Sequence, residues 1–416
     1  MINLSFQSLA YEKFSKMRVG ALFMKMGSGK TKVAVDIANS NVDKVDRLIW
    51  ICPNQVKDST IKELKKWSPR MRFRVIAYES LSQSERIFND AISYTKAGKP
   101  FLVLDESIFI KNGQTLRWQR CKAIRVLCPF CLILNGTPVV KNEWDLYWQM
   151  NMLNERIIPY NEPDFRRLFF DEKTIRAKGR RGSFIKYEFS KKNANALAKM
   201  IAPYTFKVDV NYGIASEDKT ISVKPMPMTQ VDYAGLKAKA LHNAGSLMQF
   251  MSVLGEMVML MSCDANRIAK TAELAKNRPV IIYAKYRDEV YAIRKALNDN
   301  CYYITGGTPA NERRTMLNLF ELMQDRPLIL TFGTGSYGLN LQFANEVIFN
   351  SYDWNYGTLE QAKARVLRIG QNKTVHFTFV ELDLPIQQIV KRCVMNKDSM
   401  ADFVKNQLID RAKELL

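Results

Sequence analysis

The chain has 416 residues, of which 47% are hydrophobic, so it is long enough to form two or three domains with apolar cores. Its 62 Lys and Arg against 41 Asp and Glu give a net charge of +21, which favours a polyanionic partner such as nucleic acid; a membrane surface and a simple solubility bias are the alternatives. Seven cysteines without regular spacing and no signal-peptide pattern argue against a disulfide-rich secreted protein and favour a reduced, intracellular one. The longest nearly apolar run, 247–261, carries Glu256 and is too short to span a bilayer, so its methionines indicate a core helix.

Apolar strands alternate with amphipathic helices in both halves of the chain. In the first half the predicted strands are 19–24, 47–52, 72–78, 101–106 and 131–136. In the second half they are 279–284, 301–305, 327–332, 346–350 and 375–380. This rhythm is typical of parallel sheets covered by helices, so the sequence predicts an α/β fold with two tandem domains. Two prolines in the stretch 224–230 mark the predicted boundary, which gives domains 1–228 and 229–416.

The stretch MGSGKT, residues 26–31, follows the first strand and precedes a helix. This is the context that a phosphate-binding loop requires, although Met24 stands where the full pattern has its first glycine. Gly27, Ser28 and Gly29 would bring backbone amides to the phosphates. Lys30 would reach the β- and γ-phosphates, and Thr31 would bind magnesium. The loop therefore predicts that the cofactors are a nucleoside triphosphate and Mg²⁺.

An acidic pair, Asp105 and Glu106, ends a later strand of the same half. Ligands bind at the carboxyl ends of strands in such folds, which favours a functional role over a solvated strand end. Asp105 would hold the magnesium ion, and Glu106 would orient and polarise the attacking water.

Residues 171–192 interrupt the strand–helix rhythm and are strongly basic. From residue 173 to 192 there are eight basic residues against one acid, Glu188. A Lys-Gly-Arg-Arg-Gly-Ser turn signal lies between two segments with strand character, which predicts a β-hairpin with Arg180 and Arg181 near its tip. A solvated charged loop is the alternative.

Two arginines, Arg365 and Arg368, stand three residues apart on a predicted helix, and Gln361 lies one turn earlier on the same face. Cys121, Cys128 and Cys131 include a CxxC pair, but no histidine is nearby in sequence to complete a zinc site, so buried thiols are the preferred interpretation.

These motifs together resemble the SWI/SNF-like branch of superfamily-two helicases from residue 4 to about 380. The branch has a DEAH or DESH box followed by KN, where this chain has DESIFIKN with Ile108 in place of the histidine. It also has a GTP motif, matched by LNGTPVVKN, and the glycine-rich and DWN…RxxRxGQ segments that 331–341 and 350–371 match. The GxGxxG within 331–341 could suggest a dinucleotide fingerprint, but the surrounding text favours the helicase motif.

The resemblance implies two RecA-like domains that hold ATP and Mg²⁺ between them. It implies that Gln7 reads the adenine, that Gly338 and Gln361 contribute to the nucleotide site, and that Arg365 and Arg368 stabilise the transferring phosphoryl group. It also implies a set of nucleic-acid contacts, of which Arg180 and Arg181 belong to the basic insertion. They are Asn54, Gln55, Tyr78, Gly136, Thr137, Arg180, Arg181, Gly306, Gly307 and Trp354.

The sequence thus predicts an ATP-dependent DNA translocase or helicase, similar to fork-remodelling members of the branch and acting as a monomeric motor without a membrane. Its expected place is the cytoplasm of a bacterium or a phage-infected cell, in replication, recombination or repair, with unwinding or branch migration as the output. An RNA helicase of the same superfamily and a nucleic-acid-binding protein with a regulatory ATP site are the alternatives.

Overall fold

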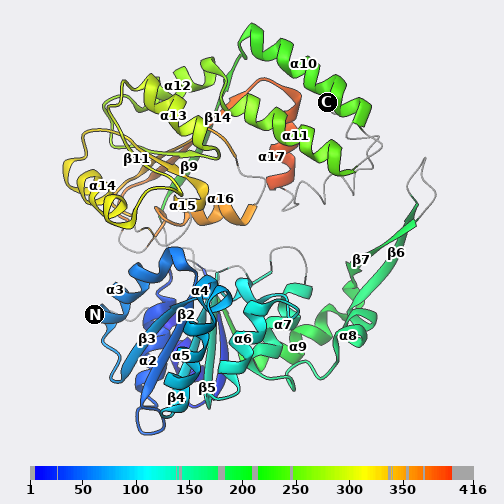
Figure 1. Ribbon diagram of the computed structural model, residues 1–416, viewed down its shortest axis with the longest axis vertical. Coiled ribbons are helices and arrows are strands. Elements are labelled where there is room, and N and C mark those ends of the chain that lie inside the picture. The colour runs from blue at the N-terminus through cyan, green and yellow to red at the C-terminus, as the bar shows by residue number, and fades with distance from the viewer. Residues whose placement is uncertain are drawn as a thin grey trace. The chain divides into compact units, whose positions relative to one another are not determined.

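The computed structural model describes residues 5–25, 27–136, 138–139, 143–176, 183–208, 214–243, 247–335, 339, 341–352, 356–368 and 371–395. The chain divides into two compact units, residues 1–210 and 211–416. Each unit has its own sheet and its own apolar core, and Figure 1 labels their elements. The predicted α/β class with two tandem units is confirmed.

The first unit contains a six-stranded parallel sheet in the order β3-β2-β4-β5-β1-β8. Its strands are β1 (Val19–Met24), β2 (Arg47–Cys52), β3 (Arg72–Ala77), β4 (Pro100–Asp105), β5 (Phe130–Asn135) and β8 (Thr205–Val208). Its helices are α1 (Ser5–Phe14), α2 (Lys30–Asn39), α3 (Lys57–Trp67), α4 (Tyr78–Gln83), α5 (Glu85–Lys96), α6 (Leu116–Arg125), α7 (Trp144–Leu153), α8 (Glu162–Phe169) and α9 (Ala194–Ile201). All six residues of β1 and of β5 are buried, because helices cover both faces of a parallel sheet.

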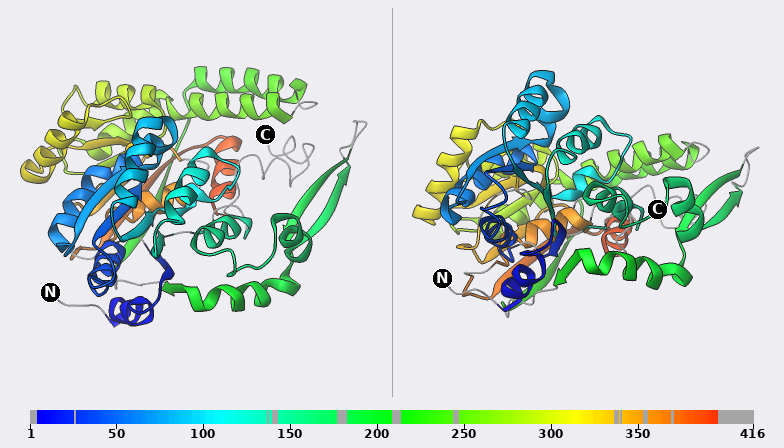
Figure 2. Two further views of the ribbon diagram at one scale, coloured as in Figure 1. Left: turned by 60° about the horizontal axis from the view of Figure 1, so that its bottom comes forward. Right: turned by 90° about the horizontal axis from the view of Figure 1, so that it is seen from below.

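An antiparallel hairpin, β6 (Phe170–Arg176) with β7 (Ser183–Phe189), leaves the first unit where the basic insertion was predicted. Figures 1 and 2 show it extending away from the sheet of this unit as a two-stranded arm. Its base is fixed in the core, since Phe170 pairs with Phe189 and is 4% exposed. The Phe170 ring also lies 5.4 Å from the ring of Trp144. The hairpin is therefore an anchored arm, and its tip residues 177–182 lie outside the described residues.

The second unit contains another six-stranded parallel sheet, in the order β11-β12-β10-β13-β14-β9. Its strands are β9 (Ser216–Val223), β10 (Ile281–Ala284), β11 (Tyr302–Ile304), β12 (Leu328–Thr331), β13 (Glu346–Phe349) and β14 (Val375–Leu382). Its helices are α10 (Pro227–His242), α11 (Leu247–Ser262), α12 (Ala265–Ala275), α13 (Arg287–Ala296), α14 (Ala310–Met323), α15 (Phe332–Gly335), α16 (Tyr356–Lys363) and α17 (Pro385–Met395).

The boundary between the units lies earlier in the chain than the predicted one after residue 228. The predicted boundary assigns residues 216–223 to the first domain, but all eight form strand β9, which pairs with β14 of the second sheet. The methionine-rich helix α11 is a core helix, as predicted, with Phe250, Met257 and Met261 buried. None of the helices that the structure describes combines the length and apolar character needed to cross a lipid bilayer.

Candidate active site

The loop between β1 and α2 has the backbone shape of a phosphate-binding loop. Gly27 and Gly29 have φ angles of 78° and 80°, a left-handed conformation that glycine adopts without steric cost. A Cβ atom on Gly29 would lie 2.4 Å from Nε2 of Gln7, so no larger residue fits there without a shift. Gly29 is also the N-cap of α2, whose first amide groups are oriented to bind an anion. Met26 lies outside the described residues.

Lys30 is the first residue of α2 and is 9% exposed. Its Nζ donates to the carbonyl oxygen of Met24 at 2.9 Å, which holds the ammonium group at the carboxyl end of β1. The Lys30 charge also lowers the pKa of Asp105, so the two side chains are electrostatically close although 75 residues separate them. Thr31, partly exposed, follows Lys30 on the same helix.

Gln7 joins helix α1 to the loop. Its Nε2 donates to the carbonyl oxygen of Ser28 at 2.8 Å, and the side chain is 6% exposed. Ser28 is fully buried, and its Oγ has no hydrogen-bond partner among the described residues. A buried hydroxyl without a partner is costly, and a bound phosphate would satisfy it. The loop therefore fits a nucleotide phosphate, with Gln7 bracing the backbone that surrounds it.

The acidic pair lies at the carboxyl end of β4. Glu106 has a φ of 51°, unusual for a residue with a side chain, and its amide donates to Oδ1 of Asp105 at 3.0 Å. Burial and then the neighbouring Glu106 charge raise the pKa of Asp105 against the opposing Lys30 charge, and the net result is a pKa of about 7. The Thr31 hydroxyl and the Asp105 carboxylate are oxygen donors, the ligand type that Mg²⁺ prefers. These residues fit the magnesium ion that the resemblance implies.

Strand β5 lies between β1 and β4 in the sheet. The Gly-Thr-Pro segment that follows β5 therefore leaves the sheet between the phosphate loop and the acidic pair. Ser107 donates its hydroxyl to Oε1 of Gln149 at 2.6 Å, and Nε2 of Gln149 donates to the carbonyl oxygen of Pro138 at 2.8 Å. Both Ser107 and Gln149 are fully buried. Sequence reasoning missed Gln149; its only signal is a polar side chain within the mainly apolar helix 144–153.

The other predicted residues of the first unit fall into three groups. Asn54 and Gln55 are exposed in a short turn after β2, where the Asn54 amide donates to the Glu79 carboxylate at 2.9 Å. Gly136 is partly exposed, and Thr137 lies outside the described residues, as do Arg180 and Arg181. Tyr78 is fully buried, and its ring stacks on Phe109 with centroids 5.7 Å apart. This burial corrects the predicted contact of Tyr78 with nucleic acid, because β3 ends one residue earlier and turns the side chain into the core.

The two arginines of the second unit do not lie on a helix. Helix α16 ends at Lys363, and both Arg365 and Arg368 belong to the turn that follows. The amide of Leu341 donates to the carbonyl oxygen of Arg365 at 3.2 Å, which takes an acceptor that a continuing helix would use. Arg365 is 7% exposed and Arg368 is partly exposed. Gln361 remains on α16, as predicted, and its Oε1 has no hydrogen-bond partner among the described residues.

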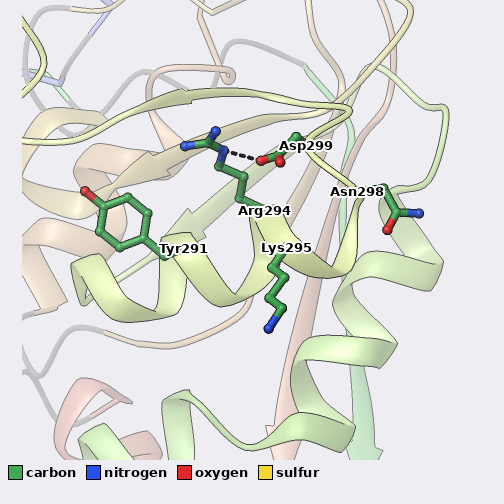
Figure 3. Close-up of a pocket in the computed structure, with 5 residues that line it drawn as sticks. All are labelled: Tyr291, Arg294, Lys295, Asn298 and Asp299. Carbon is green, nitrogen blue, oxygen red and sulfur yellow. Dashed lines mark hydrogen bonds and ion pairs between the residues drawn. The ribbon is translucent and has the colours of Figure 1, made fainter.

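Gly306 and Gly307 are exposed in the turn between β11 and α14, with no atom near a Cβ built on Gly306. Gly338 and Trp354 lie outside the described residues. The hollow in Figure 3, around the end of α13, is not part of this site: its Arg294 turns toward Asp299 and forms an ion pair, while Lys295 points away.

The three thiols that include the CxxC pair are buried in the first unit: Cys121, Cys128 and Cys131. Burial raises the pKa of Cys131 to about 11, so this thiol is a poor metal ligand at neutral pH.

Residues 264–370 match the helicase conserved C-terminal domain. A Xenopus tropicalis SWI/SNF-related matrix-associated actin-dependent regulator of chromatin subfamily A-like protein 1 is 26% identical over 406 residues, covering 88% of this chain and 41% of the relative. An uncharacterized ATP-dependent helicase of Mycoplasma genitalium is 22% identical, covering 94% of this chain and 40% of the relative. The chain thus spans about two fifths of the length of these relatives.

Among solved structures, the Sulfolobus solfataricus SWI2/SNF2 ATPase core in complex with double-stranded DNA covers 100% of this chain and 95% of that one, with 18% identity and a TM-score of 0.44. The helicase domain and the SWI/SNF-related similarity along almost the whole chain support the predicted resemblance to the SWI/SNF-like branch of helicase superfamily two.

Proposed function

We propose that the protein is a DNA-dependent ATPase that translocates along DNA and remodels forked or branched DNA. The observation that carries the proposal is the meeting of Lys30 with Asp105 and Glu106 at one edge of the first sheet. The phosphate loop supplies the cation, Lys30, and the acidic pair at the end of β4 supplies the carboxylates. Together they supply what phosphoryl transfer to water requires.

Each residue of the first unit has a definite task in this proposal. The loop amides and Lys30 bind and orient the triphosphate, and Gln7 keeps the loop in its bound shape. Thr31 and Asp105 would hold Mg²⁺, which neutralises charge on the β- and γ-phosphates when bound. Glu106 accepts a hydrogen bond from the attacking water and orients it; its left-handed backbone fixes where the carboxylate points.

The second unit supplies Arg365 and Arg368, which we assign to stabilising charge on the transferring phosphoryl group. Because these arginines and the phosphate loop belong to different units, turnover requires the two units to act together, and a cycle of this kind can drive movement along a polymer.

DNA is the proposed polymer because the net charge of +21 suits a polyanion and because the relatives are named as chromatin regulators and helicases. Fork or branch specificity is proposed from the anchored basic hairpin β6–β7, which has no task in ATP hydrolysis.

The deciding experiment is steady-state ATP hydrolysis with single-stranded, duplex, forked and four-way DNA and with RNA of the same sequences. We expect DNA to stimulate turnover, forked or four-way DNA most, and Lys30→Ala to abolish turnover while most DNA binding remains. Stimulation by RNA in preference to DNA would identify an RNA helicase instead. Nucleotide binding without turnover under all conditions would indicate a regulatory ATP site.

A further inference from the structure

A hollow at the amino ends of the first sheet is lined mainly by basic residues. Four of its six lining residues are basic and two are apolar: they are Lys16, Arg18, Lys44, Lys99, Pro129 and Phe130. All four basic side chains are exposed. No acidic residue lines the hollow.

The sheet itself brings these residues together from four separate parts of the sequence. They precede β1, β2, β4 and β5, which are neighbours in the sheet. The register aligns their starts: Phe101 of β4 lies opposite Phe130, and the amide of Cys131 donates to the carbonyl oxygen of Arg18 at 2.8 Å. The cluster is therefore fixed by the fold and does not depend on a flexible loop.

The four cations are not neutralised within the part of the chain that the structure describes, where none of them forms an ion pair. One carboxylate of the strand-start loops, Asp46, already has partners outside the hollow. Its oxygens pair with Arg47 at 2.9 Å and accept the backbone amide of Lys99 at 2.8 Å. The hollow in Figure 3 differs, because there an aspartate pairs with the arginine. Unpaired like charges around one hollow repel each other, which leaves this one suited to an external anion.

This edge has no part in ATP hydrolysis. The phosphate loop and the acidic pair lie at the carboxyl ends of the same strands, and six residues of strand separate the two edges by about 20 Å. We infer that the basic hollow binds backbone phosphates of a second nucleic-acid segment, one that the carboxyl-edge loops do not hold. The inference rests on the proposed function and adds to it a site for a second DNA arm.

The stiffness of duplex DNA limits which substrates can contact both the amino-end and the carboxyl-end edge of the first sheet. The persistence length of a duplex is about 150 base pairs, so a short linear duplex cannot fold back from one edge of a small domain to the other. A fork or a four-way junction can present a second arm in another direction. Lysine ammonium groups bind phosphates as point charges without reading sequence, which suits a contact to a passing arm.

The test reverses two of the charges, in Lys16→Glu/Lys99→Glu, and measures DNA affinity by fluorescence anisotropy at several salt concentrations. The matched control is Lys62→Glu/Lys65→Glu, which changes the net charge equally through two exposed lysines on α3. For forked DNA we expect the log–log salt slope to fall by about 2 in the hollow variant, since each lost phosphate contact removes about 0.9. Affinity for a short linear duplex should change no more than in the control.

The outcomes separate this inference from the proposed function. If the unaltered protein shows no nucleic-acid-stimulated ATP turnover, the proposed function itself fails. If turnover is stimulated but the hollow variant binds forked DNA like its control, the second-arm site is refuted and the motor assignment stands. Maximal turnover on saturating linear duplex should be equal in both variants, which shows that neither has disturbed the ATP site.

Discussion

Gln149 joins three segments of the first unit that the sequence leaves unconnected. Its Oε1 accepts from the Ser107 hydroxyl at 2.6 Å, and its Nε2 donates to the carbonyl oxygens of Pro138 and Asp145 at 2.8 and 2.6 Å. Ser107 directly follows the acidic pair, and Pro138 belongs to the GTP segment. A fully buried amide with these partners ties the two segments, so a shift in one is transmitted to the other.

Replacing Gln149 by leucine, which has a similar volume, should weaken both stability and coupling. The buried Ser107 hydroxyl would lose the acceptor for its proton, and the partly buried Pro138 carbonyl would lose its donor, at a cost of about 1–3 kcal/mol. Tryptophan fluorescence during urea unfolding can follow this, since five of the six tryptophans lie in residues 1–210. We also expect the stimulation of ATP turnover by DNA to fall while the basal rate remains, an effect that lost stability alone would not produce.

A double-mutant cycle with Ser107→Ala isolates the hydrogen bond between the two side chains. If the two stability changes add to within about 0.5 kcal/mol, the side chains do not interact and the coupling role is refuted.

The catalytic candidates were accessible to sequence reasoning because their spacing is local. Lys30 follows a glycine-rich loop between a strand and a helix, and Asp105 and Glu106 end a strand. The hydrogen bond between Ser107 and Gln149 joins residues that are 42 positions apart and depends on how α7 packs, so no local sequence pattern predicts it. For Tyr78 the sequence predicted a nucleic-acid contact, but the side chain is buried. A motif resemblance does not show whether a side chain at a strand end faces solvent or the core.

At the scale of elements, all ten predicted strands occur, with ends that differ by no more than two residues. Two strands were missed, β8 and β9, and both are edge strands of their sheets. The β9 sequence SEDKTISV has no buried residue and therefore lacks the apolar signal from which strands are predicted. Its main-chain pairing with β14 makes it a strand, and that long-range pairing also moves the boundary between the units.

The turn that carries the arginines was predicted as helix because Gln361, Arg365 and Arg368 have helical spacing. Tertiary contacts override that preference. The amide of Leu341, from a separate loop, donates to the Arg365 carbonyl, and the Arg368 amide donates to the carbonyl of Val366 two residues earlier at 2.9 Å. The arginines are thus presented on a tight turn held by another segment, which a periodicity argument cannot foresee.

The hairpin β6–β7 is anchored at its base by aromatic and cation–π contacts. Phe170 and Phe189 meet with ring centroids 5.6 Å apart, and the Arg166 guanidinium lies over the rings of both Trp144 and Tyr187, at 4.5 and 4.9 Å. Aromatic and cation–π contacts of this kind contribute about 0.5–1.5 kcal/mol each. An isolated two-stranded hairpin is marginally stable, so this base is what keeps the arm in place.

Deleting residues 179–183 should abolish unwinding or branch migration while leaving much of the DNA-stimulated ATP turnover. The shortened arm would no longer reach between the strands, whereas the ATP site is unchanged. Both activities are measured on one forked substrate. A variant that keeps the loop length but carries Arg180→Ser and Arg181→Ser separates the effect of charge from that of length. Unwinding that survives the deletion intact would show that the arm does not separate strands.

At the scale of the whole molecule, the residues proposed for catalysis are divided between two units with separate cores. Residues 1–210 contain Lys30, Asp105 and Glu106, and residues 211–416 contain Arg365 and Arg368. Neither unit alone holds the full set of groups that we propose for phosphoryl transfer. The proposed motor therefore depends on the second unit for chemistry as well as for binding the polymer.

Replacing Arg368 by alanine tests this division in the intact protein. If the guanidinium stabilises charge that develops on the transferring phosphoryl group, turnover should fall roughly 10³-fold or more, as for other arginines in this role. The dissociation constant of a fluorescent ATP analogue should change far less, because the interaction strengthens mainly in the transition state.

Arg392→Ala is the matched control, since it removes one exposed positive charge from α17 of the same unit. Its turnover should stay close to that of the unaltered protein. Near-normal turnover in Arg368→Ala would refute the catalytic assignment of that arginine. An equal loss of turnover and of ATP affinity would instead mean that Arg368 binds the nucleotide in its ground state, and the second unit would then contribute affinity and not catalysis.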